Sequence, residues 1–183
     1  MSPYRGANHE TIGSDILSLV DAVLMPEQIF GKEIYAQLLS VKREGWYPIG
    51  DLLKAFEHLD SRLGSDSMRK VGWSLFKLSH EAAVRATCKS ARDIVYGIDD
   101  MYHRANRGRD IGGWKVIEFV PGRALLEKTT PHHCVVEEGI LEAGLRAIGV
   151  RGRIEQPECS RRGAPACRML VTSHVRDARW MGT

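Results

Sequence analysis

The sequence predicts an α+β fold in which a helical layer packs on an antiparallel sheet of about four strands. Two observations support this prediction. Apolar residues recur at helical spacing through the first 105 residues. After Gly112-Gly113 the pattern changes to short runs rich in β-branched and aromatic residues with turn signals between them. Helices followed by a segregated set of strands are typical of α+β domains.

The first helices follow from caps and breaks in the chain. Ser14 is a suitable N-cap for a helix that begins DILSLVDAVL and carries a broad apolar stripe. Met25-Pro26 interrupts this helix, and helical spacing resumes over residues 27–42. Tyr47-Pro48 is the next break, because a residue before proline avoids the α region.

The next helical segment starts at Asp51 and ends at a break over Gly64-Ser65-Asp66. Two amphipathic helices are predicted beyond it, over residues 66–86 and 90–105. One apolar stripe supports the first of them: Val71, Leu75, Leu78, Ala82 and Ala86.

The C-terminal half is predicted to hold the strands. Residues 114–130 read as two strands joined by Pro121-Gly122, which suits a type II turn because glycine supplies the positive φ. A helix over 134–148 ends at Gly149, a suitable αL cap. Two further strands, at 150–156 and 167–175, flank a loop.

Length and composition favour one globular domain over residues 14–175, with a flexible arm at 1–13 and a tail at 176–183. The net charge of +3 is mild and makes a nucleic-acid partner an unfavourable interpretation. No signal peptide or membrane-length apolar run is present, so we expect a cytoplasmic protein with no membrane contact. Thiols stay reduced in the cytoplasm, so the four cysteines indicate metal binding or packing rather than disulfides.

Three of these cysteines form the most informative pattern. Cys134 opens a predicted helix, where the helix dipole favours a thiolate, and Cys159 and Cys167 flank a loop that can turn back on itself. Three thiolates and one further ligand would make a closed tetrahedral zinc site. Buried, unreactive thiols are the other interpretation, and the spacing leaves both open.

The segment from Trp114 to Val171 resembles the vinyl-4-reductase domain family. The resemblance is carried by KVIEFVPGRALLEKTTPHHCVVEEGILEAGLRAIG and ECSRRGAPACRMLV. The whole chain is also similar to a myxobacterial paralogous family of similar length. The resemblance implies the fold of the Bet-type subunits of the TRAPP tethering complex, a homodimer, and zinc held by three cysteines near a ligand pocket.

In this chain the implied zinc ligands are Cys134, Cys159 and Cys167. Family members that bind zinc add a glutamate three residues before the second cysteine, where this chain has Gln156. The residues that could replace that glutamate are Glu155, Glu158, His132 and His133.

The resemblance also implies a pocket between helices and sheet for a small hydrophobic or aromatic ligand. Trp114 falls where sensing members of the family place a pocket tryptophan. The predicted ligand-binding residues are Trp114, His80, Trp73, Tyr102 and Phe119.

No nucleotide, phosphate-loop, metalloprotease or serine-hydrolase motif occurs in the sequence, so we expect no nucleotide cofactor and no enzymatic activity. The favoured function is small-molecule sensing by population shift, with the signal passed to a separate signalling or regulatory protein. The alternatives are an interaction scaffold without a ligand and, from the family's name alone, a reductase of tetrapyrrole metabolism.

Overall fold

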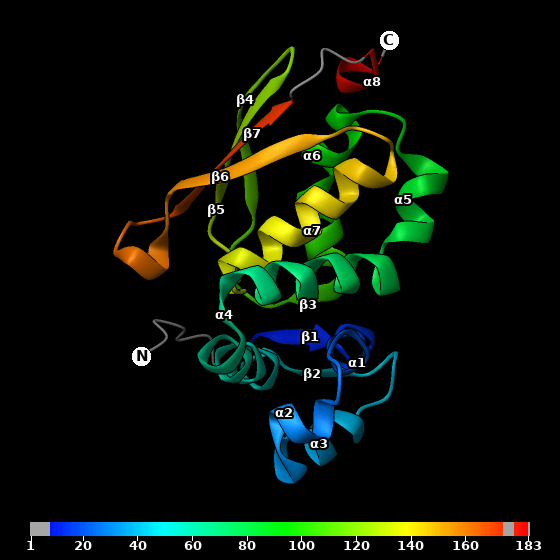
Figure 1. Cartoon of the computed structure of the whole chain (residues 1–183), viewed down its shortest axis with the longest axis vertical. Helices are drawn as coiled ribbons and strands as arrows, with labels where there is room; N and C mark the ends of the chain where they lie inside the picture. The colour runs from blue at the N-terminus through cyan, green and yellow to red at the C-terminus, as the bar shows by residue number, and fades with distance from the viewer. Residues whose placement is uncertain (1–7, 174–177, 183) are drawn as a thin grey trace.

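The computed structural model describes residues 8–173 and 178–182 of the 183-residue chain. Helices fill the N-terminal half and four longer strands the C-terminal half (Figure 1). None of the helices in the described residues is long and apolar enough to cross a membrane. The elements are, in chain order, β1 (Glu10–Ile12), α1 (Gly13–Ala22), α2 (Pro26–Phe30), α3 (Lys32–Leu39), β2 (Trp46–Pro48), α4 (Ile49–Ser79), α5 (Glu81–Thr87), α6 (Ala91–Ala105), β3 (Asn106–Arg107), β4 (Trp114–Val120), β5 (Arg123–Lys128), α7 (Cys134–Ala147), β6 (Gly152–Glu158), a 3-10 turn η1 (Ser160–Arg162), β7 (Cys167–Ser173) and α8 (Ala178–Met181).

Strands β4 to β7 form one antiparallel sheet in the order β4-β5-β7-β6. This confirms the predicted α+β class with a four-stranded antiparallel sheet. The β4–β5 hairpin turns at Gly122, whose φ is 75°, as a glycine at that turn position allows. The pairing of β5 with β7 sets Lys128 opposite Cys167, at the end of the sheet where α7 begins.

A second, smaller sheet has the order β2-β1-β3 and was not predicted. Its central strand β1 lies within residues 1–13, which the sequence assigned to a flexible arm; residues 1–7 lie outside the described residues. Thr11 of β1 is fully buried, and its hydroxyl donates to the carbonyl of Ala105 at 3.3 Å. Strands of two or three residues are too short to show a period-two pattern, which is why the sequence did not reveal them.

Helix α4 contains the predicted break as a kink rather than an end. Gly64 has φ 71° and ψ 169°, a conformation that glycine adopts without strain, and helix continues on both sides of it. The predicted helix over 66–86 is wrong beyond Ser79. The chain turns at His80 and continues as the short helix α5, and Leu78, predicted to be in the buried stripe, is 50% exposed.

Helices α6 and α7 lie against the four-stranded sheet, and α4 packs along α7 (Figure 1). The N-terminal helices α1 to α3 and the first part of α4 form a layer at the other end of the molecule (Figure 1). One cluster of buried apolar side chains runs from Ile16 in α1 through Leu126 in β5 to Trp180 in α8. The two layers therefore share a core, and the space between them is where a ligand site can form.

Residues 178–181 of the predicted C-terminal tail form α8. Trp180 is 1% exposed, its indole N–H donates to the carbonyl of Val120 at 2.8 Å, and its ring stacks on Phe119 at 5.5 Å. This part of the tail is thus packed on the end of the sheet.

Candidate functional site

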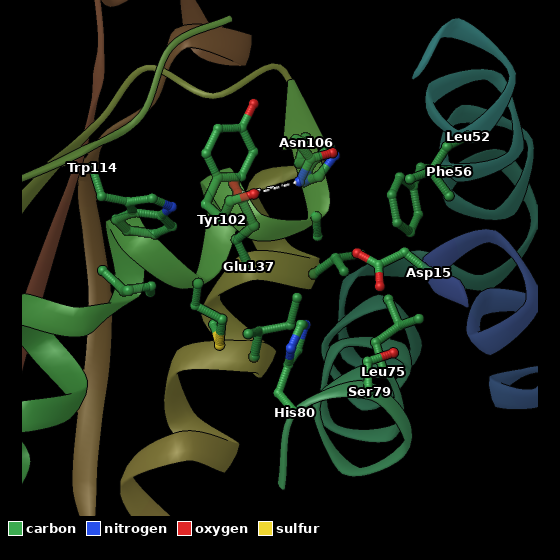
Figure 2. A pocket seen from close by; sticks show the side chains of 16 residues that line it. Asp15, Leu52, Phe56, Leu75, Ser79, His80, Tyr102, Asn106, Trp114 and Glu137 are labelled. Carbon is green, nitrogen blue, oxygen red and sulfur yellow. Dashed lines mark hydrogen bonds and ion pairs between the residues drawn. The ribbon is translucent and has the colours of Figure 1, made fainter. Parts of the chain in front are cut away.

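A cavity of about 50 Å³ lies between the N-terminal helices and the helices on the sheet. At roughly 10–15 Å³ of occupied volume for each water molecule, it holds a few waters. Figure 2 shows it from close by. It is lined by Asp15, Leu52, Phe56, Leu75, Ser79, His80, Ile98, Met101, Tyr102, Ala105, Asn106, Trp114, His132, Val136, Glu137 and Ile140.

A larger hollow of about 460 Å³ adjoins this cavity, a volume within the range of small-molecule sites. Two exposed arginines, Arg43 and Arg104, line it. The two spaces share seven lining residues, so they form one continuous site, which we call the interlayer pocket: Asp15, Ser79, His80, Ile98, Met101, Ala105 and Ile140.

Three of the five predicted ligand-binding residues, His80, Tyr102 and Trp114, line this pocket (Figure 2). Trp73 and Phe119 do not. The indole of Trp73 donates to Glu142 at 3.1 Å on the outer side of the α4–α7 pair, and Phe119 stacks under α8. Aromatic residue type alone could not separate pocket from core, because both environments select it.

Asp15 of α1 is a polar lining residue that sequence reasoning missed. Its carboxyl lines both parts of the pocket and carries no ion pair within the described residues. Burial raises the pKa of Asp15 to about 7, against the lowering effect of its hydrogen bond with Ser79. An acidic residue inside the apolar stripe of the first predicted helix was the available signal.

His80 stays neutral at physiological pH, because burial lowers its pKa to about 4. It sits where α4 ends and α5 begins, and its ring lies 6.3 Å from that of Phe76. The turn between the two helices therefore presents an uncharged imidazole to the pocket.

His132, just before α7, lines the pocket. Its Nδ1 lies 3.7 Å from Oε1 of Glu137, whereas its Nε2 is buried with no hydrogen-bond partner in the described part of the chain. The rings of Phe56 and Tyr102 pack edge-on against it at 6.1 and 5.5 Å. Burial, with a smaller effect from the charge of Lys128, lowers the pKa of His132 to about 3.

Glu137 is in turn held by a buried lysine. Lys128, 1% exposed, places Nζ 2.7 Å from Glu137 and donates to the carbonyls of Thr130 and His132 at 3.1 and 2.9 Å. The hydroxyl of Thr130 donates to the same carboxylate at 2.7 Å. This network fixes Glu137 beside His132.

The three predicted cysteines meet behind this network. Sγ of Cys134 lies 3.3 Å from Sγ of Cys167 and 3.6 Å from Sγ of Cys159, and all three are at most 4% exposed. Lys128 Nζ is 3.8 Å from Cys134 Sγ. The hydrogen bond from Cys134, the charge of Lys128 and the hydrogen bonds from Ser160 lower the pKa of Cys167, so the cluster favours one thiolate beside the lysine.

The proposed replacements for a fourth ligand do not join the sulfurs. No histidine, aspartate or glutamate of the described residues completes the group, which excludes Glu155 and Glu158 in this structure. His132 lines the pocket, and Nε2 of His133 lies 3.3 Å from the carboxylate of Asp60. Gln156 binds Arg162 through its backbone carbonyl.

No family model and no curated protein matches the chain. Solved structures match its fold. The H-NOX protein from S. oneidensis in the Fe(II)NO ligation state aligns with a TM-score of 0.69 and 18% identity, over 90% of this chain and 99% of that one. The Fe(II) unliganded H-NOX protein from K. algicida gives 0.67 and 12%, over 90% and 97%. A third structure, described as probing heme distortion in the H-NOX family, gives 0.66 and 11%, over 92% and 95%.

These identities establish a shared fold and nothing finer, but they overturn two expectations. The resemblance to the vinyl-4-reductase family and its TRAPP-like fold is wrong. It rested on one corner, where a helix start, a loop and a strand entry bring cysteines together, and the layout of the whole chain is that of H-NOX proteins. The zinc expectation is also wrong, since the matched proteins are described with Fe(II) and heme. That Cys134, Cys159 and Cys167 bind a metal stays a prediction about those residues.

Proposed function

We propose that this chain is a non-enzymatic sensing domain that holds haem in the interlayer pocket and passes a change in helix packing to a separate partner protein. The fold likeness supports the proposal, because it spans nine-tenths of this chain and nearly all of the matched H-NOX proteins. The proposed cytoplasmic location and homodimer are further parts of it. The small hydrophobic or aromatic ligand expected from the sequence gives way to haem and a small molecule bound beside it.

The buried Nε2 of His132 is the observation that carries the proposal. Histidines that bind metal direct their second nitrogen to a carboxylate or carbonyl, which fixes the ring and the tautomer. His132 comes near this arrangement: Nδ1 lies 3.7 Å from a carboxylate oxygen of Glu137, just beyond hydrogen-bond length, and Nε2 is buried without a partner among the described residues, in a side chain that lines the pocket. A metal ligand must also be neutral, and burial keeps this imidazole uncharged. We therefore propose that His132 is the residue that would bind the iron of haem in this pocket.

The remainder of the pocket fits haem in its chemistry. Its walls are largely apolar, and Arg43 and Arg104 at the hollow have no ion pair within the described residues. Exposed guanidinium groups are suitable partners for the carboxylates that haem carries. Bound haem would supply an iron centre at which a small molecule can bind.

The volumes show what haem binding would require of this chain. The 50 Å³ beside His132 is too small for a macrocycle, so the N-terminal layer has to move away from α6 and α7. The kink at Gly64 divides α4 between the two layers, and it is a position where the backbone can change direction at low cost. Haem or its ligand would favour one packing of the layers over another, which is the change a partner would read.

Haem titration of the purified chain tests the proposal. We expect a Soret band that saturates at one haem per chain, with the spectrum of a histidine-ligated iron. His132→Ala should lose that spectrum and regain it with added imidazole, whereas His103→Ala, an exposed histidine on α6, should leave it unchanged. Absence of saturable uptake would refute the haem site. Loss of the band in His80→Ala or His103→Ala, with His132→Ala unaffected, would move the ligand assignment and leave the haem site intact.

A further inference from the structure

The polar atoms of the interlayer pocket are unequally satisfied. Tyr102 donates its hydroxyl proton to the carbonyl of Ile111 at 3.1 Å, and both oxygens of Glu137 are taken by Thr130 and Lys128. Two buried lining atoms in the described residues have no hydrogen-bond partner: Oδ1 of Asn106 and Nε2 of His132. Oδ1 of Asn106 can only accept a hydrogen bond, and a buried acceptor without a donor is destabilising.

The acceptor role of Asn106 is set by its other atom. Its Nδ2 donates to the backbone carbonyl of Tyr102 at 3.0 Å, so the amide cannot be reversed without placing two oxygens together. Asn106 is 2% exposed and stands at the end of α6, where β3 begins. Its Oδ1 is thus held in the pocket wall.

Asp15, from helix α1 of the N-terminal layer, adds a carboxyl to the same wall. Its carboxyl contacts Ser79, and no cation stands within ion-pair distance in the described residues. In Figure 2 the side chains of Asp15 and Asn106 lie on the same side of the pocket, across from Trp114. The lining also holds groups that can donate, among them the Trp114 indole, His80 and the hydroxyl of Ser79, and none of them hydrogen-bonds to Oδ1 of Asn106.

We propose that Asp15 and Asn106 form an acceptor subsite for a small ligand that donates hydrogen bonds, so that the pocket selects ligands with an N–H or O–H group over those without one. The physical reason is that such a ligand can donate to the buried oxygen of Asn106, beside the carboxyl of Asp15, whereas a ligand without a donor leaves that oxygen unpaired. This inference rests on the proposed pocket site.

Imidazole and 1-methylimidazole are matched probes for this subsite. Both bind iron through the same kind of nitrogen, but only imidazole has an N–H to donate. We expect the haem-loaded protein to bind imidazole about tenfold more tightly, the factor expected for one hydrogen bond to a buried acceptor. Asp15→Leu and Asn106→Leu should each reduce the preference toward that of free haem, and Asp21→Asn, an exposed position on the same helix, should retain it.

The same comparison on unmodified, haem-free chain keeps the test independent of haem and of how the variants fold. Imidazole should shift the side-chain amide signals of Asn106 in ¹⁵N-labelled protein, and 1-methylimidazole should not. Equal affinities and equal shifts for the two probes would overturn the subsite. If the chain does not take up haem but imidazole still shifts the Asn106 amide signals, the proposed function is refuted and this inference stands.

Discussion

Gly72 of α4 and Gly139 of α7 face each other where the two helices cross. A Cβ on Gly72 would stand 3.0 Å from the Cα of Gly139, and one on Gly139 would stand 3.1 Å from the Cα of Gly72. Each would also overlap a backbone carbonyl of the other helix, that of Val136 or Arg69. The pair sets how closely α4 approaches α7, and therefore how the pocket-lining residues at the ends of these helices are placed.

Replacing either glycine should separate the two helices. We expect Gly139→Ala to lower the free energy of unfolding by about 2–4 kcal/mol, because backbone atoms rather than a flexible side chain have to yield. Urea unfolding followed by circular dichroism measures it. Gly97→Ala is the control, since no atom lies within 4 Å of its added Cβ in the middle of α6. It should gain roughly 0.5–1 kcal/mol from helix propensity. Equal losses at both sites would contradict this account.

The sequence predicted features that depend on local chemistry. Gly122 indicated the hairpin turn and Gly64 the break in α4. The positions of the three cysteines predicted that their sulfur atoms lie close together. It did not reveal the small sheet, whose strands are too short to show a period. It also missed Asp15 and Asn106 as pocket residues, because their roles depend on which helices of distant sequence come together.

The fold family could not be predicted from the three clustered cysteines either, because the fold also depends on which helices of distant sequence come together. Cys134, Cys159 and Cys167 report where one helix, one loop and one strand meet. A contact between these three elements is compatible with several arrangements of the N-terminal helices. The amphipathic patterns of those helices indicate which face is buried but not the topology.

The carboxyl of Asp15 makes stability depend on pH. Its pKa is raised to about 7 in the folded chain, from about 3.8 when unfolded, so between these values the folded state binds more protons. Stability contributed by this site is therefore lost as pH rises from about 4 to about 7. Asp15→Asn should abolish the loss and be more stable than wild type by on the order of 1–2 kcal/mol at pH 8. Urea unfolding at pH 5 and pH 8 checks this, with Asp21→Asn as an exposed control on the same helix. If Asp15→Asn raised the free energy of unfolding more at pH 5 than at pH 8, burial would not oppose ionisation of Asp15.

Thiol labelling should distinguish Cys88 from the other three cysteines. Cys88 is partly exposed at the end of α5, whereas Cys134, Cys159 and Cys167 are at most 4% exposed. A maleimide should modify one thiol per folded chain quickly and four per chain in denaturant, since thiolate reactivity requires access as well as a low pKa. Cys88→Ser should remove the fast phase in the folded protein. A fast phase that persists in this variant would show that the cluster opens to solvent.

Lys128 and Glu137 should be strongly coupled, because both are buried and each satisfies the other. Their charged atoms are 2.7 Å apart, with side chains 1% and 5% exposed. Lys128→Met leaves the carboxylate of Glu137 buried without a cation, and we expect it to cost about 3–5 kcal/mol of unfolding free energy. Adding Glu137→Gln removes that charge while keeping an oxygen for Thr130, so the double variant should be more stable than Lys128→Met alone.

A double-mutant cycle of these variants, measured by urea unfolding at pH 7.5, gives the coupling energy between the two side chains. Arg153→Met and Glu155→Gln form the matched exposed pair, with side chains 66% and 46% exposed and atoms also 2.7 Å apart. Because water screens that pair, its coupling should stay below about 1 kcal/mol. Additive effects at Lys128 and Glu137 would mean that Thr130 and the backbone carbonyls, rather than the ion pair, hold Glu137 beside His132.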